Sequence, residues 1–206
     1  MERDAASGSI EGIILAAGMS RRLGRPKQFL EIGGKPLLAH VIERALASRL
    51  DAVTVIVGHE AEATRTAIAH YDVAVKVNPD YAKGQSTSLI AGVNALRAGA
   101  DATVVLLGDQ PGIRVATVDA LIARRRATRA PIVMTAYGDI RSHPVLFGAE
   151  TFDELRAISG DKGARDVIRS YGDRVNAVAD GRTSPPADVD THEAYAAILR
   201  EGVPDR

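Results

Sequence analysis

The sequence of 206 residues contains no cysteine, and this absence removes several classes of function. Disulfide bonds, thiolate nucleophiles and zinc or iron–sulfur sites built on thiolates are excluded. Lys plus Arg and Asp plus Glu are equal at 26 each, so the basic excess usual in proteins that bind nucleic acid or anionic membranes is missing. We therefore expect no nucleic-acid and no membrane partner, and we expect any bound phosphate to be held by local charges.

Long apolar runs are missing as well. No stretch approaches the roughly 20 apolar residues needed to span a bilayer. Residues 1–11 are polar and acidic and lack the apolar core of a signal peptide. These absences predict a cytoplasmic protein. The 46% of hydrophobic residues and 25% of charged residues suit one globular domain over residues 1–206, long enough to bury a core without disulfides.

Short apolar runs alternate with amphipathic stretches along the first part of the chain. Strands are predicted for four apolar runs: residues 13–16, 53–57, 73–77 and 103–107. Helices are predicted for the segments that follow them: residues 36–48, 61–69, 87–96 and 116–126. This β-α-β-α order, with continuous apolar strands, predicts a three-layer α/β fold with a Rossmann-like, mostly parallel sheet and helices on both faces.

The pattern changes after Pro131. Apolar runs at residues 132–135 and 144–147 flank Gly138-Asp139, a turn signal of β-hairpins, so an antiparallel hairpin insertion within the sheet is expected. Two helical segments, one short strand and a last helix complete the prediction: residues 151–158, 164–170, 175–179 and 191–200.

A basic loop with two glycines follows the first strand, at residues 17–27. Ligands bind at the carboxyl ends of parallel strands, and small residues such as Ala17 and Gly18 let the backbone approach a phosphate. The loop also carries four cations: Arg21, Arg22, Arg25 and Lys27. Neither the P-loop nor the dinucleotide-binding fingerprint fits its spacing. From the residues alone, a triphosphate cradle and a flexible basic loop are equally good interpretations.

Aspartates occupy two further places where a ligand is expected. Asp109 follows the strand at 103–107 and shares the ligand-binding edge of the sheet with the basic loop. Asp188 and Asp190 alternate in a segment that we expect to be a short strand, with both side chains on one side. Carboxylates with phosphate oxygens and water are the usual ligands of Mg²⁺ in phosphoryl-transfer sites. The alternative for each aspartate is capping of a turn or helix.

Three polar segments lie between predicted elements. Lys83 and Gly84 precede hydroxyl residues at a helix start, an arrangement typical of anion or base binding and also of plain helix capping. His143 precedes a proline and is by itself weak evidence of a site. Residues 159–165 open a helix with two glycines and two cations, which suits either a phosphate of a second substrate or a capped, solvated loop.

Residues 15–27, Leu-Ala-Ala-Gly-Met-Ser-Arg-Arg-Leu-Gly-Arg-Pro-Lys, resemble the signature of the molybdopterin and sugar-phosphate nucleotidyltransferases, the MobA-like NTP transferases. Residues 106–111 resemble the acid-after-strand motif of that family, residues 84–89 its Gly-x-Ser-x-Ser-Leu motif, and residues 188–191 its closing Asp-x-Asp-Thr motif. Residues 160–165 look like the form found in molybdenum-cofactor cytidylyltransferases. Leu23 stands where methionine is frequent in the family. The resemblance covers essentially the whole chain and implies the nucleotide-diphospho-sugar transferase type of fold.

The resemblance also implies roles for individual residues. Lys27, Arg22 and Asp109 would be catalytic, and Asp109 and Asp190 would hold Mg²⁺. Nucleotide binding is implied for a larger set: Leu15, Ala16, Ala17, Gly18, Ser20, Arg21, Lys27, Gly84 and Ser86. The acceptor would contact His143, Lys162 and Arg165. No nucleophile–base pair is recognisable, and none is needed, because a phosphate that attacks the α-phosphorus of an NTP is already an anion.

The implied reaction moves a nucleoside monophosphate from an NTP to the phosphate of molybdopterin, with release of pyrophosphate. CTP is favoured over GTP because Leu-Ala-Ala-Gly accompanies cytidine in the family, and the methyl group of Ala17 would crowd a purine; one methyl group discriminates by only about 1–3 kcal/mol. A client molybdenum enzyme would receive the product. The alternatives are a guanylyl- or sugar-phosphate nucleotidyltransferase and, from another class, a non-catalytic molybdenum-cofactor carrier or maturation chaperone.

Overall fold

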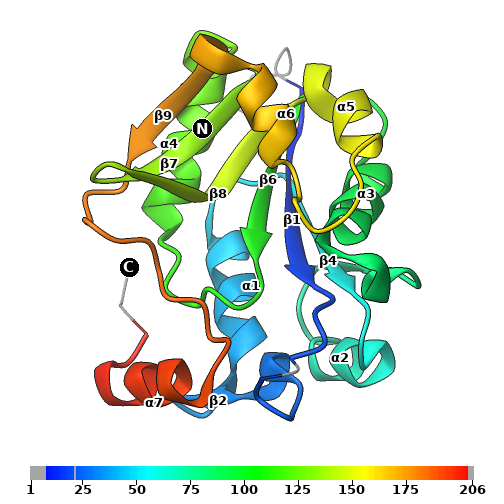
Figure 1. Cartoon of the computed structure of the whole chain (residues 1–206), viewed down its shortest axis with the longest axis vertical. Coiled ribbons are helices and arrows are strands. Elements are labelled where there is room, and N and C mark those ends of the chain that lie inside the picture. The colour runs from blue at the N-terminus through cyan, green and yellow to red at the C-terminus, as the bar shows by residue number, and fades with distance from the viewer. Residues whose placement is uncertain (1–7, 21, 204–206) are drawn as a thin grey trace.

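The structure, a computed structural model, describes residues 8–20 and 22–203. Its centre is a seven-stranded sheet whose strands lie in the order β5-β4-β1-β6-β8-β7-β9 (Figure 1). The strands in chain order are β1 Ile10–Ala16, β4 Ala52–Val57, β5 Ala74–Val77, β6 Ala102–Leu107, β7 Ile132–Tyr137, β8 Ile140–Gly148 and β9 Val175–Ala179. Only β8 runs against its neighbours β6 and β7, so the prediction of a mostly parallel sheet with an antiparallel hairpin is confirmed.

The helices cover both faces of this sheet, as the β-α-β-α pattern predicts. In chain order they are α1 Leu37–Ala47, α2 Ala61–Ala67, α3 Gln85–Ala95, α4 Val115–Thr128, α5 Phe152–Arg156, α6 Arg165–Ser170 and α7 His192–Glu201. Side chains alternate along each strand, so Ile14 of β1 packs with α1 and α4 while its neighbour Ile13 packs with α3 and α5. The three-layer α/β fold class is therefore confirmed.

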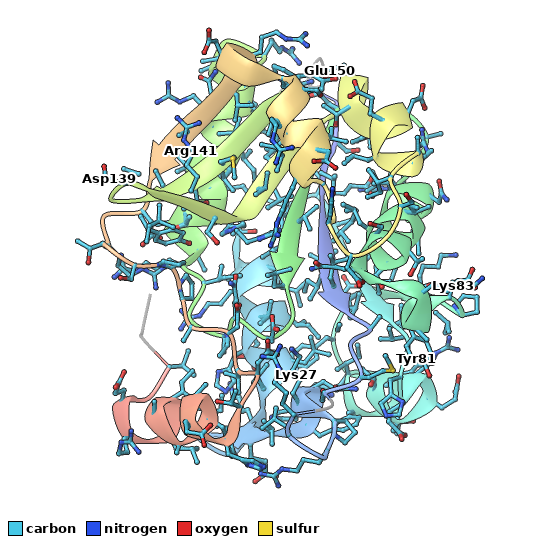
Figure 2. The ribbon with its side chains drawn as sticks, in the orientation of Figure 1. Lys27, Tyr81, Lys83, Asp139, Arg141 and Glu150 are labelled. Carbon is cyan, nitrogen blue, oxygen red and sulfur yellow. The ribbon has the colours of Figure 1, made fainter. Side chains whose placement is uncertain are left out.

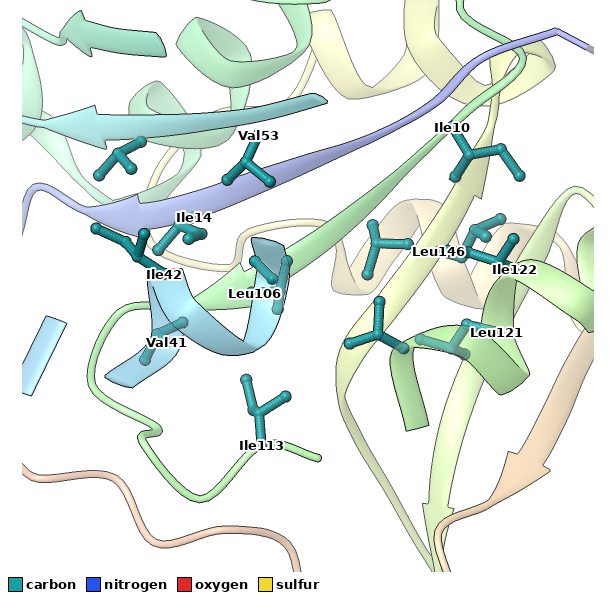
Figure 3. Packing of buried hydrophobic residues seen from close by; sticks show 14 of the residues in the cluster. Ile10, Ile14, Val41, Ile42, Val53, Leu106, Ile113, Leu121, Ile122 and Leu146 are labelled. Carbon is teal, nitrogen blue, oxygen red and sulfur yellow. The ribbon is translucent and has the colours of Figure 1, made fainter. Parts of the chain in front are cut away.

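The larger of the two cores lies between the sheet and the helices α1 and α4. Val41 and Ile42 of α1 reach Ile14 and Leu106 on the central strands, and Leu121 of α4 lies in the same cluster (Figure 3). All five side chains are fully buried. This packing fixes the central strands β1 and β6 side by side, and the loops after both strands therefore start from the same edge of the sheet.

A two-stranded sheet, β2 Glu31–Ile32 with β3 Lys35–Pro36, was not predicted from the sequence. Its strands are two residues long, too short to give a periodic signal. They are joined by Gly33 and Gly34, both with positive φ, which is the conformation that tight hairpin turns require. The small sheet brings Ile32 into a third apolar cluster with Leu23, Leu30, Leu37 and Val189, beside α7.

Among residues 8–20 and 22–203, no helix has both the length and the apolar character needed to cross a membrane.

Candidate active site

Two adjoining cavities lie at the carboxyl ends of the central strands. The first, of about 450 Å³, extends from the loop after β1 to the start of α3 and is here called the nucleotide cavity. Its wall includes Leu15 to Ser20 in chain order, together with Lys27, Asp109, Tyr81, Gly84, Gln85, Ser88 and Asp161. Figure 2 shows Lys27 and Tyr81 at this end of the sheet, on separate segments.

The loop after β1 is shaped by Ser20 and by an apolar anchor. The backbone N–H of Lys27 donates a hydrogen bond to Ser20 Oγ at 3.0 Å, and that of Leu23 donates to the Ser20 carbonyl at 3.0 Å. Leu23 is buried in the third apolar cluster. Ser20 adopts φ +51°, a left-handed conformation that turns the chain back on itself. The loop, called the cradle below, is therefore held in a defined fold, and its binding of a triphosphate stays a prediction.

The cations of the cradle do not all face the cavity. Lys27 lines the nucleotide cavity, whereas Arg22 is exposed and lies outside both linings. Arg25 is exposed and lies over the ring of Tyr195, 5.6 Å from its centroid. Arg21, predicted to bind the nucleotide, lies outside the described residues. The catalytic role of Arg22 therefore stays a prediction that would need the side chain to turn toward bound phosphate.

Lys27 joins the two aspartates that the sequence singled out. Its Nζ lies 2.5 Å from Asp109 Oδ2 and also donates a hydrogen bond to Asp190 Oδ1. Burial disfavours the charged form of Lys27, but the charges and hydrogen bonds of Asp109 and Asp190 outweigh it and raise the pKa of the ammonium group above its ordinary value. Two carboxylates from distant segments thus share one cation.

The segment with Asp188 and Asp190 is not a strand, so that expectation was wrong. The backbone N–H of Val189 donates to the Asp109 carbonyl at 3.0 Å, and the Val189 side chain is buried in the third apolar cluster. Both aspartates line the second cavity because Val189 points into the core between them. The Gln110 side-chain amide donates to Asp188 Oδ1 at 2.7 Å. Burial and then the charge of Asp109 raise the pKa of Asp188.

The second cavity, of about 330 Å³, is here called the acceptor cavity. It contains all three residues predicted to bind the acceptor, His143, Lys162 and Arg165. Burial, opposed by Asp109 and assisted by Arg165, lowers the pKa of His143 to about 4, so its imidazole is neutral near pH 7. The Tyr137 hydroxyl donates to the His143 carbonyl at 2.9 Å and fixes this part of β8. His143 comes from β8, whereas Lys162 lies in the loop before α6 and Arg165 begins α6 itself.

The two cavities have one wall in common. Leu15, Gln85, Leu107 and Asp109 line both of them. Asp109 therefore lies where a group held in one cavity can meet a group held in the other. Among the described residues, no group of three or more His, Cys, Asp or Glu side chains is placed to hold a metal ion, so a metal here would rely on the two carboxylates and on oxygen atoms of a substrate.

Of the two residues at the start of α3 that were predicted to bind the nucleotide, Gly84 and Ser86, one lines the cavity and the other does not. Gly84 lines the nucleotide cavity, but Ser86 is fully buried, its Oγ has no hydrogen-bond partner, and it does not line either cavity. Gln85 and Ser88 line the nucleotide cavity instead. Residues three apart share one face of a helix, and Ser86 lies on another face. Helical periodicity applied to the sequence would have predicted that Ser88 lies on the same face as Gln85.

Ala17 lines the nucleotide cavity, but the residue is only 5% exposed. A methyl group on Gly58 would lie 2.9 Å from Ala17 Cβ and 2.5 Å from Tyr81 Cβ. Ala17 thus packs against Gly58 within the cavity wall. Because so little of Ala17 is exposed, it offers a purine only a small contact, and the preference for CTP that the sequence suggested stays a prediction.

The comparisons with known proteins identify the family. The sequence model of the MobA-like NTP transferase domain matches residues 12–175, which include the cradle, Asp109 and the acceptor residues. The chain belongs to the MobA-like NTP transferase family. The match ends before Asp188 and Asp190.

Two relatives match this MobA-like chain over nearly its whole length. Purine catabolism protein PucB of Bacillus subtilis is 32% identical, with 92% of this chain and 95% of PucB covered. Nicotine blue oxidoreductase of Paenarthrobacter nicotinovorans is 31% identical, with 92% and 96% covered. The names describe different roles, so these relatives support the family and leave the acceptor open.

A solved structure has the same fold. The crystal structure of Rv0371c from Mycobacterium tuberculosis H37Rv is 32% identical and superposes with a TM-score of 0.86 over 95% of this chain and 99% of that chain. A structure of Rv0371c in complex with manganese gives a TM-score of 0.81 at 31% identity, with 93% of this chain and 98% of that chain covered. Family and fold together support a nucleotidyltransferase that takes an NTP.

Proposed function

We propose that this protein transfers a nucleoside monophosphate, CMP by preference, from an NTP to the terminal phosphate of molybdopterin or the molybdenum cofactor, with release of pyrophosphate. The observation that carries the proposal is the common wall of the two cavities at Asp109, with Lys27 on one side and Lys162 and Arg165 on the other. A transferase of this kind needs two anionic substrates to meet at one point. Two cavities, each with its own cations and one shared carboxylate, suit that requirement.

The residues act by alignment and charge neutralisation. In the nucleotide cavity the cradle would hold the triphosphate against Lys27, whose raised pKa keeps it charged near neutral pH. In the acceptor cavity Lys162 and Arg165 would hold the acceptor phosphate, with neutral His143 as a hydrogen-bonding neighbour. The attacking phosphate oxygen is already an anion, so no general base is needed. Its in-line approach to the α-phosphorus would displace pyrophosphate.

The donor set suits a divalent cation, for which we propose Mg²⁺. Asp109 and Asp190 already hold one cationic group between their carboxylates, and hard oxygen donors of this type, completed by phosphate and water, are those that Mg²⁺ uses in phosphoryl-transfer sites. When bound, the ion would neutralise charge that develops on the triphosphate. The manganese complex of Rv0371c supports a divalent metal in a relative.

The preference for CTP rests on the Leu-Ala-Ala-Gly form of the cradle. Because the Ala17 methyl group packs against Gly58, we propose that it acts by setting the position of Tyr81 at the nucleoside end of the cavity. A change of one methyl group is worth about 1–3 kcal/mol, so CTP should be preferred over GTP and not accepted alone.

The test is pyrophosphate release with each of the four NTPs and Mg²⁺, with and without molybdopterin. Release with CTP that depends on molybdopterin is expected. Release only when a sugar phosphate replaces molybdopterin would identify a sugar-phosphate nucleotidyltransferase. Tight binding of molybdopterin without pyrophosphate release from any NTP would identify a carrier.

A further inference from the structure

The loop before α6 reaches both cavities with consecutive residues. Asp161 lines the nucleotide cavity, whereas its neighbour Lys162 lines the acceptor cavity. The loop is held against the start of α3, where the backbone N–H of Ser86 donates to the Gly160 carbonyl at 3.3 Å. In the sequence Asp161 belongs to a run expected to bind the acceptor, and its position on the nucleotide side calls for a separate explanation.

Close packing at Gly84 fixes where the Asp161 carboxylate lies. A methyl group on Gly84 would lie 2.5 Å from Asp161 Oδ1 and 2.9 Å from the Gly160 carbonyl oxygen. Gly84 has φ +123°, a conformation that other residues rarely adopt. The glycine therefore leaves room for the carboxylate next to the start of α3, in the cavity that Tyr81 and Ser88 also line.

Asp161 has no protein partner within residues 8–20 and 22–203. Lys162, the nearest cation in sequence, pairs with Asp166 at 3.7 Å instead. A free carboxylate would repel the phosphates of an NTP, but the proposed function assigns those phosphates to the cradle and Lys27. With the phosphates held there, the nucleoside of the bound NTP would lie beside Gly84 and Asp161. A carboxylate accepts hydrogen bonds and cannot donate them, so it suits a nucleoside N–H or O–H donor.

We propose that Asp161 is a specificity-determining residue that accepts a hydrogen bond from a donor on the nucleoside half of the NTP. The donor is either the exocyclic amino group of the base or a ribose hydroxyl. Cytosine has this amino group, whereas uracil has a carbonyl oxygen in its place. Asp161 is exposed in the free protein, and discrimination follows because an analogue without the donor loses the charge-assisted hydrogen bond to the carboxylate. This inference rests on nucleotide binding in the first cavity and names the residue that would select the nucleotide there.

The experiment measures binding of CTP, UTP, 2′-deoxy-CTP and 3′-deoxy-CTP by calorimetry, with Mg²⁺ and without acceptor. It compares the wild-type protein with Asp161→Asn and Asp161→Ala. The control is Asp166→Asn, which also removes one negative charge. Asp166 lies five positions after Asp161, is exposed and lines neither cavity. Thermal unfolding of each variant shows whether it is folded.

The wild type should bind CTP at least tenfold more tightly than the analogue without the donor, and both Asp161 variants should lose most of that ratio. Loss of the CTP-to-UTP ratio identifies the amino group, and loss of a CTP-to-deoxy-CTP ratio identifies a ribose hydroxyl. Wild-type ratios in folded Asp161 variants, or an equal change in affinity for all four nucleotides, would overturn the inference and leave the proposed function intact. Absence of NTP binding by the wild type would instead overturn the proposed function.

Discussion

The ammonium nitrogen of Lys27 lies between the carboxylates of Asp109 and Asp190, 2.5 Å from Asp109 Oδ2. The cradle and the segment after β9 are thereby linked through a single charge. The same oxygen atoms are those proposed for Mg²⁺, so the lysine and a divalent cation would compete for them. A triphosphate in the cradle offers Lys27 an alternative partner. Nucleotide binding should therefore favour metal binding.

This competition predicts that Lys27→Ala binds Mn²⁺ more tightly than the wild type when no nucleotide is present. The expected gain is roughly tenfold or more, since a unit charge a few ångströms away is worth several kcal/mol at the partly screened surface of a protein. Electron paramagnetic resonance of free Mn²⁺ measures this directly. Lys35→Ala is the control, because Lys35 pairs with Glu43 on the surface. Weaker Mn²⁺ binding by Lys27→Ala would contradict the competition.

Loss of the shared carboxylate should abolish transfer. Asp109→Asn keeps the shape of the side chain but removes the charge on the common wall, and we expect pyrophosphate release to fall about a thousandfold or more. Asp119→Asn provides the comparison, because Asp119 on α4 accepts a hydrogen bond from the backbone of Arg49 away from both cavities. A folded Asp109→Asn protein that turns over at a near-normal rate would rule out the assigned role.

Gly84→Ala should destabilise the protein and weaken nucleotide binding. The new methyl group would combine an unfavourable φ with contacts of 2.5 Å to Asp161 and 2.9 Å to Gly160. Gly99→Ala separates the two costs, since Gly99 has φ +83° but nothing within 4 Å of the position that a new methyl group would take. We expect a loss of about 3 kcal/mol for Gly84→Ala and about 1 kcal/mol for Gly99→Ala in urea denaturation. Equal losses of stability in the two variants would show that Asp161 and Gly160 move aside for the new methyl group at no cost.

Asp180 provides a test of stability against pH. Its buried carboxylate pairs with Arg182 and with Arg114, 3.6 Å from the Arg114 guanidinium, at the start of the segment that leads to Asp190. Burial opposes its ionisation, but the hydrogen bonds from Arg182 and Thr117 outweigh burial and lower the pKa of Asp180 below its usual 3.8. The resulting stabilisation is present above about pH 3.8 and is lost as the pH falls through the lower folded-state pKa.

Asp180→Asn should therefore lower the free energy of unfolding by about 3 kcal/mol at pH 7, because two arginines lose their partner. The difference from the wild type should shrink as the pH falls below 4. Asp139→Asn, an exposed change in the turn between β7 and β8, serves as the control. Urea denaturation at several pH values measures the effect. A difference that does not depend on pH would mean that the carboxylate charge is unimportant.

The order of the main elements and the position of Asp109 were predictable from the sequence because both follow from local pattern and sheet topology. Asp109 could be placed because it directly follows a buried parallel strand. Asp190 could not be placed by alternation, because the chain around it is irregular and its direction is set by Val189 packing against Leu23 and Leu37. That contact joins residues more than 150 positions apart, and no local pattern contains it.

The start of α3 shows a second limit of sequence interpretation. The hydroxyl-rich run pointed to Ser86, but the helix begins at Gln85 and turns Ser86 into the interior. A shift of a residue or two in a helix boundary changes which side chains face the cavity. The position of Asp161 in the wall of the first cavity was missed for a different reason. It lies in a loop whose course between two cavities depends on packing against Gly84.

The common wall formed by Leu15, Gln85, Leu107 and Asp109 has a kinetic consequence. A nucleotide joined to its acceptor would occupy both cavities at once, whereas pyrophosphate would occupy only the cradle end of one. The joined product should then inhibit competitively against both substrates. Pyrophosphate should compete with the NTP alone, and it should be free to leave while the larger product still bridges the wall.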